Sequence, residues 1–156
     1  MNEMSDFERS PPESQLNDDP PDEDRLALAE QLIAGLQDEF AECADAQIAR
    51  LTEICLTRWV KPARREAAIR QLRRIAHDLK GEAGTFGYDL VTEIAECFGV
   101  YLREVPEARQ QHADMVRYVG AFHRAWGERL QGDGGAVGRS LLAGLAAVNA
   151  QARHGS

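Results

Sequence analysis

The sequence has few cysteines, and those few are widely spaced. Cys43, Cys55 and Cys97 are an odd number, and no Cys-x-x-Cys pair occurs. This pattern disfavours a disulfide-bonded scaffold and a zinc site. We therefore expect free, buried thiols in a protein from a reducing compartment.

Long apolar runs, signal patterns and nucleotide-binding loops are absent as well. No segment approaches the roughly 18–20 apolar residues that span a membrane, and the first residues lack a basic-then-apolar signal pattern. We expect a cytoplasmic protein without membrane contact. No Gly-x-x-x-x-Gly-Lys-Ser/Thr loop occurs, so the chain is not expected to use ATP by itself. His112, His123 and His154 do not have the spacing of a metal site, and we expect no bound metal or cofactor.

The negative net charge lies almost entirely at the N-terminus. Residues 1–24 contain nine acids and one base, which gives the whole net charge of −8, and the rest of the chain contains 17 of each. A charge-balanced body is not typical of a nucleic-acid-binding protein. Residues 1–21 are rich in Pro, Asp, Glu and Ser, which predicts a disordered acidic tail.

The remainder shows apolar residues at spacings of three and four, the period of a helix, and no alternation typical of strands. Asp22 or Asp24 suits the start of the first helix, which has one longer step in its spacing, and Pro62 and Pro106 suit helix starts. We expect helices over residues 22–58, 62–85, 90–102, 106–130 and 137–148.

These elements predict an all-α protein, an antiparallel four-helix bundle over residues 22–131. Residues 132–156 are expected to form a Gly-rich turn, a short C-terminal helix that packs on the bundle or binds a partner, and a tail. We interpret the apolar stripes as core rather than as docking grooves. The predicted core includes the stripe of the first helix and both tryptophans: Leu26, Leu32, Ile33, Leu36, Phe40, Trp59 and Trp126.

Residues 76–87, Ala-His-Asp-Leu-Lys-Gly-Glu-Ala-Gly-Thr-Phe-Gly, carry the most specific signal. On a helical wheel His77 lies roughly 140° from the centre of the apolar stripe, so its ring should face solvent. Gly81 and Gly84 share its face, although glycine in a helix costs about 0.5–1 kcal/mol relative to alanine. Bare backbone there would let another protein approach the ring. Lys80, one turn from His77, could touch a group attached to the imidazole.

A basic stretch precedes this segment. Residues 58–74 contain seven bases and one acid, Glu66. Arg70, Arg73 and Arg74 lie on the turns just before His77, where a positive field would suit an anionic ligand or an acidic partner. A solvated helix face is an equally good interpretation of the same stretch.

Residues 76–87 resemble the signature of histidine-containing phosphotransfer (HPt) domains, His-x-Leu-Lys-Gly followed by small residues, an apolar residue and Gly. The resemblance implies a four-helix bundle with an exposed phosphoacceptor histidine on its second helix. It makes His77 the phosphoacceptor, Lys80 the phosphate-contacting residue and Gly81 the residue that leaves clearance. Glu82 departs from the family pattern, which has a small residue there, and adds an anion near the site.

The resemblance implies a phosphorelay intermediate. It would accept a phosphoryl group from a receiver domain or histidine kinase and pass it to a response regulator, with any divalent cation on the partner receiver domain. Neutral imidazole is a good nucleophile near neutral pH, and phosphoryl transfer needs mainly positioning and charge stabilisation. We expect a monomer without enzymatic activity of its own. The alternative is a helical adaptor that binds receiver domains or kinases without being phosphorylated. A fragment of a dimeric kinase is disfavoured, because no ATP domain follows.

Overall fold

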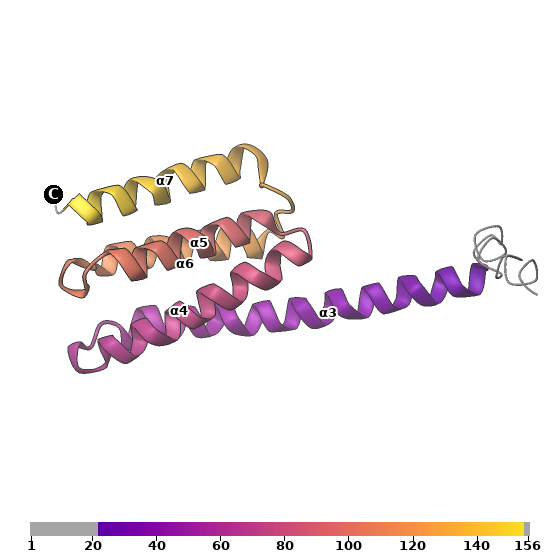
Figure 1. The fold of residues 1–156 in the computed structure, drawn as a ribbon, viewed down its shortest axis with the longest axis horizontal. Coiled ribbons are helices and arrows are strands. Elements are labelled where there is room, and N and C mark those ends of the chain that lie inside the picture. Colours follow the sequence, from indigo (N-terminus) through magenta and orange to yellow (C-terminus); the bar gives the residue numbers. More distant parts are fainter. Residues whose placement is uncertain (1–21, 155–156) are drawn as a thin grey trace, which may run out of the picture. The chain divides into compact units, whose positions relative to one another are not determined.

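The protein is described by a computed structural model that covers residues 22–154. Within that range every regular element is helical, as expected (Figure 1). The predicted acidic tail, residues 1–21, and residues 155–156 lie outside the described residues. The helices, in chain order, are α3 (Glu23–Glu53), the π-helical turn η1 (Ile54–Arg58), α4 (Pro62–Thr85), α5 (Asp89–Glu104), the 3-10 turn η2 (Glu107–Arg109), α6 (His112–Gly127) and α7 (Gly135–His154).

The chain divides into two units, Met1–Gln37 and Asp38–Ser156. The described residues of the first unit form the beginning of α3, and their large apolar side chains are between 52% and 62% exposed. The prediction that this stripe belongs to the core is wrong here, because helical spacing determines which residues share a face but not whether another element covers it. The exposed residues are Leu26, Leu28, Leu32, Ile33 and Leu36.

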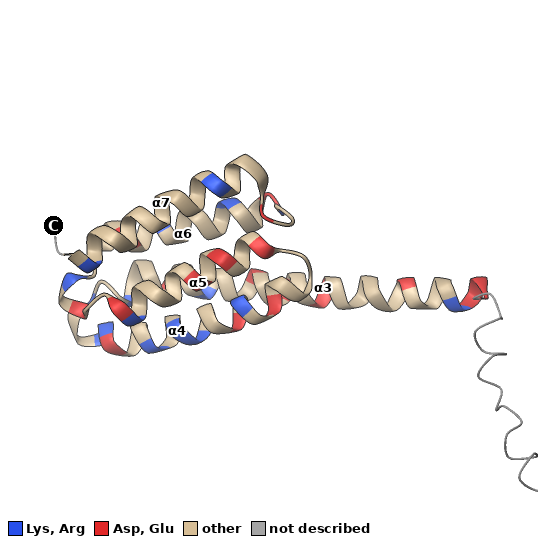
Figure 2. Ribbon diagram, turned by 45° about the horizontal axis from the view of Figure 1, so that its top comes forward, with Lys and Arg blue, Asp and Glu red and all other residues tan. Residues whose placement is uncertain are grey.

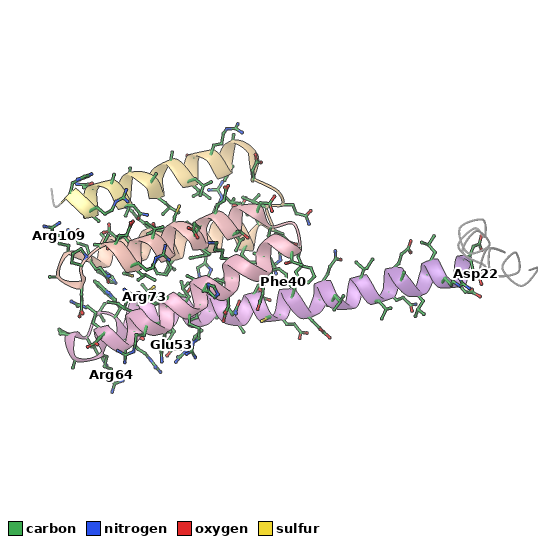
Figure 3. All side chains as sticks on the ribbon, in the orientation of Figure 1. Asp22, Phe40, Glu53, Arg64, Arg73 and Arg109 are labelled. Atoms are coloured by element: carbon green, nitrogen blue, oxygen red, sulfur yellow. The ribbon has the colours of Figure 1, made fainter. Side chains whose placement is uncertain are left out.

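The second unit contains a single hydrophobic core. Phe40 lies near the beginning of the part of α3 that belongs to this unit. It is 5% exposed and stacks on Phe86 with ring centroids 4.6 Å apart. It also meets the edge of Trp126 at 5.5 Å (Figure 3 labels Phe40). Trp126 and Trp59 are both buried, which confirms that they are core aromatics.

Helix α5 packs against α4, α6 and α7, so it lies at the centre of this unit. The turn between α4 and α5 is hydrogen-bonded to the loop that precedes α7. The amide of Gly132 donates to the Gly87 carbonyl at 2.7 Å, and the amide of Leu90 donates to the Gly132 carbonyl at 2.8 Å. Gly87 adopts φ 85°, a left-handed conformation that favours glycine after a helix. The turn therefore returns α5 along α4, beside the segment that carries His77.

The C-terminal helix α7 packs on the bundle, which is the first of the two roles predicted for it. Buried Asn149 donates from its amide to the Cys97 carbonyl of α5 at 3.1 Å, and the Tyr118 hydroxyl of α6 donates to Asn149 Oδ1 at 2.5 Å. Gly138 lets the first turn of α7 approach the preceding loop, because a Cβ there would collide with the Asp133 carbonyl.

Two smaller predictions about the helices need correction. The first helix ends as a π-helical turn, Ile54–Arg58, rather than as regular α-helix. Pro106 precedes only the 3-10 turn η2, and α6 begins at His112, because Gln110 and Gln111 are extended.

The cysteines are also less uniform than predicted. Cys55 is buried, and burial raises the pKa of its thiol to about 12. Cys97 is partly buried and Cys43 is exposed. All three are free thiols, as expected.

Candidate functional site

His77 lies on the solvent side of α4. Its neighbours Ala76 and Leu79 are 2% and 0% exposed, whereas His77 itself is exposed. Pro62 occupies the first turn of α4, where its missing N–H costs no hydrogen bond. From there an uninterrupted helix to Thr85 determines which side of the helix each residue occupies. The expectation that the imidazole faces solvent is confirmed.

A cavity of about 240 Å³ opens beside His77, between α4 and α5. Its apolar lining consists of the smallest side chains, which leave room for a compact group next to the ring. The basic lining comes from both helices. The lining residues are Arg73, Ala76, His77, Lys80, Ala95, Glu96, Gly99 and Arg103.

The cavity is electropositive overall, since three bases and one acid line it. Lys80 Nζ lies 2.5 Å from Glu96 Oε2, and this hydrogen bond is the main reason that the pKa of Glu96 is lowered. Arg73, labelled in Figure 3, reaches from α4 to α5 and donates to the Leu102 carbonyl at 2.8 Å. A formal surplus of two positive charges suits a phosphoryl group, which carries about −1.5 to −2 near pH 7.

The glycines near His77 have different surroundings. A Cβ built on Gly81 would meet nothing within 4 Å, so its face of the helix is open. A Cβ on Gly84 would lie 3.3 Å from Thr92 Oγ1 of α5, so that glycine also serves the packing of α4 on α5. Gly99 in α5 leaves space for the guanidinium of Arg103, whose Nη1 would lie 3.2 Å from a Cβ at Gly99.

The basic side chains of residues 58–74, before His77, make different kinds of contact. Lys and Arg positions recur along α4 in Figure 2. Arg65 donates to the Trp59 carbonyl at 2.8 Å and lies over its ring, so it stabilises the fold. Arg70 pairs with Glu66 at 3.2 Å. Of the three arginines predicted to bind partners, Arg73 lines the His77 cavity, and Arg70 and Arg74 line a separate cavity of about 500 Å³ with Arg50 of α3.

Sequence reasoning missed the contribution of α5 to this site. Glu96, Gly99 and Arg103 follow one another at spacings of three and four, so they share one face of that helix. The spacing was visible in the sequence, but nothing local indicated that this face would pack beside His77. Within residues 22–154, no group of three His, Cys, Asp or Glu residues could hold a metal ion. No helix in the same range is long and apolar enough to cross a membrane.

A fully helical bundle with an exposed histidine beside a basic cavity is the architecture of a phosphocarrier module. The family model for the Hpt domain matches residues 23–131, and the chain belongs to that family. Hpt domains act in histidine phosphotransfer within two-component phosphorelays, where they interact with receiver domains and kinases. Neither a curated protein nor a solved structure matches the chain.

Proposed function

We propose that His77 is the phosphoacceptor of a phosphorelay. In this role the protein accepts a phosphoryl group from the aspartyl phosphate of a receiver domain or from a histidine kinase. It then passes the group to a response regulator. The observation that carries the proposal is the exposed His77 ring at the edge of a cavity that also contains Lys80 and Arg103.

The chemistry needs little from this chain besides a nucleophile and charge. An unprotonated ring nitrogen of His77 attacks the phosphorus of the aspartyl phosphate. The N–P bond forms, the P–O bond to the aspartate breaks, and the aspartate leaves as an ionised carboxylate. Lys80 stabilises the charge on the phosphoryl oxygens during transfer. Any divalent cation is supplied by the receiver domain.

Two features support access by a partner. The open space around Gly81, one turn beyond His77, leaves bare backbone for a receiver domain to approach. Arg70, Arg73 and Arg74 on the preceding turns offer positive charge to an acidic receiver pocket. In the proposed role the protein is cytoplasmic, and it is a monomer when no receiver domain or kinase is bound.

The test is phosphoryl transfer to a His77→Gln variant. Purified wild-type protein is incubated with radiolabelled phosphorylated receiver domains, and separately with phosphoramidate, a small phosphoryl donor that needs no partner. Wild-type protein should gain an acid-labile, alkali-stable label, and His77→Gln should gain none. Its stability should change by less than about 0.5 kcal/mol, since His77 is an exposed polar residue.

His154→Gln is the matched control, because His154 is an exposed histidine near the end of α7 and outside the cavity. This control should accept label like the wild type. Label that persists on His77→Gln would move the phosphoacceptor to another histidine. Binding to receiver domains without any label on the wild-type protein would instead support the adaptor function.

A further inference from the structure

Lys80 is already paired in the unphosphorylated protein. Its ammonium lies 2.5 Å from the Glu96 carboxylate, and both side chains are about half exposed, at 49% and 44%. The contact lowers the pKa of Glu96, so the carboxylate is ionised near neutral pH. Lys80 is therefore held between α4 and α5 by a charge that a phosphoryl group would have to replace.

Glu96 is the only acidic residue among those that line the cavity. It belongs to α5, whereas His77 and Lys80 belong to α4. Thr92, one turn before Glu96, donates from its hydroxyl to the Lys80 carbonyl at 3.2 Å. This bond fixes α5 against the helix that carries Lys80, and it keeps the Glu96 carboxylate within reach of the ammonium.

The Lys80 ammonium is a single positive charge on a flexible side chain, so it is drawn toward the anion that attracts it most strongly. A phosphoryl group on His77 carries about −1.5 to −2 charge, more than a single carboxylate. Arg103 lies on the same face of α5 as Glu96, and its charge contributes to the lowered pKa of Glu96. When Lys80 turns to the phosphoryl group, Arg103 remains near the carboxylate as a second cation.

We propose that Glu96 is a positioning residue that holds Lys80 in the unphosphorylated state and competes with the phosphoryl group on His77 for its ammonium. This inference rests on the proposed role of His77. Phosphorylation of His77 then breaks the ion pair between Lys80 and Glu96, and this loss lowers the stability of the phosphorylated state. The phosphoryl group is therefore passed on more readily. Removing the charge of Glu96 would shift the balance toward phosphorylated His77.

The experiment measures the equilibrium constant for phosphoryl exchange between the protein and a receiver domain that labels the wild type. Glu96→Gln should raise the phosphorylated fraction of the protein, with an equilibrium constant about two- to fivefold higher, which is the range of half-exposed ion pairs. Glu96→Asp keeps the charge and should return the constant toward the wild-type value. Glu93→Gln removes an exposed acid from the same helix outside the cavity, and should have no more than a minor effect.

A double-mutant cycle distinguishes competition for the Lys80 ammonium from simple repulsion between Glu96 and the phosphoryl group. In a Lys80→Ala background, Glu96→Gln should lose most of its effect. If its effect persists there, the carboxylate acts directly and the inference is wrong. If Glu96→Gln equals the wild type while the wild type is phosphorylated, only this inference fails. If the wild type takes no phosphoryl group from any donor, the proposed function fails as well. Circular dichroism and urea unfolding confirm that each variant is folded.

Discussion

Gly81 and Gly84 show how two residues of one type on one helix face can serve different ends. Both were predicted to clear a path to His77. Gly81 has open space around it, whereas Gly84 lies against Thr92 of α5. Only Gly81 therefore has surroundings that suit partner approach alone, and only Gly81 offers a clean test of that role.

We expect Gly81→Gln to stabilise the fold and to hinder transfer. Glutamine is a better helix former by about 0.5–1 kcal/mol, and its side chain would enter the space one turn beyond His77. Single-turnover transfer from a phosphorylated receiver domain should slow at least about tenfold, which corresponds to about 1.4 kcal/mol of barrier. Phosphorylation by phosphoramidate, which needs no bulky partner, should change much less.

Gly120→Gln is the control for this prediction. Gly120 is an exposed glycine within α6 whose added Cβ would also meet nothing within 4 Å. It should gain similar stability and keep the wild-type transfer rate. Unchanged transfer kinetics in Gly81→Gln would show that this glycine does not provide clearance.

Among the helices of residues 22–154, α7 is the one that the Hpt family model does not cover, since the match ends at residue 131. Its attachment includes a buried polar cluster as well as apolar side chains. Asn149 is 5% exposed and connects the Tyr118 hydroxyl to the Cys97 carbonyl, so three helices meet at one amide. A buried polar group that loses its partner costs about 1–3 kcal/mol.

We therefore expect Asn149→Leu to lower the free energy of unfolding by about 1–3 kcal/mol. The Tyr118 hydroxyl loses the Asn149 acceptor and keeps only the Cys97 carbonyl, 3.1 Å away, and that carbonyl loses its amide donor. Urea unfolding followed by circular dichroism measures the change. Tyr118→Phe should cost less in the Asn149→Leu background than in the wild type, because the hydrogen bond between Tyr118 and Asn149 is already lost there. Ser140→Ala, at an exposed position of α7, should stay within about 0.5 kcal/mol. Equal losses in Asn149→Leu and Ser140→Ala would show that the cluster does not stabilise the attachment of α7.

For the molecule as a whole, the charge is separated along the chain. The first 24 residues hold the entire net charge of −8, while the segment just before His77 holds seven bases. The acidic segment could compete with an acidic receiver pocket for the basic helix. A plain rival is that it only keeps the protein soluble. Attraction between solvated charges is weak, which favours the rival.

Deletion of residues 1–21 separates these two roles. Stopped-flow association with a receiver domain is measured for full-length and shortened protein at low and at physiological salt. Under the competition hypothesis the shortened protein associates faster at low salt, and the gain fades as the Debye length falls to about 8 Å. Under the solubility hypothesis, which we favour, the two proteins associate at the same rate at both salt concentrations. A gain that disappears with salt would overturn this expectation.

The bounds of α4 and the outward direction of His77 follow from the sequence by itself. Pro62 marks the beginning of the helix, the glycine-rich segment marks its end, and the 3.6-residue period determines which side chains face the core. These are local effects, since each depends on residues within a turn or two. The helical class and the phosphotransfer signature were readable for the same reason.

Only the tertiary structure decided what surrounds His77 and which apolar faces are covered. Glu96 and Arg103 reach the cavity because α5 returns along α4, a pairing set by core packing and by the hydrogen bonds of the turn at Gly87 and Gly132. The helical period correctly places Phe40 in the core. The same period predicts that Leu32 is a core residue, but Leu32 is 62% exposed. A period describes one helix, whereas burial and charge pairing depend on a second element, and the choice of that element belongs to the folded chain.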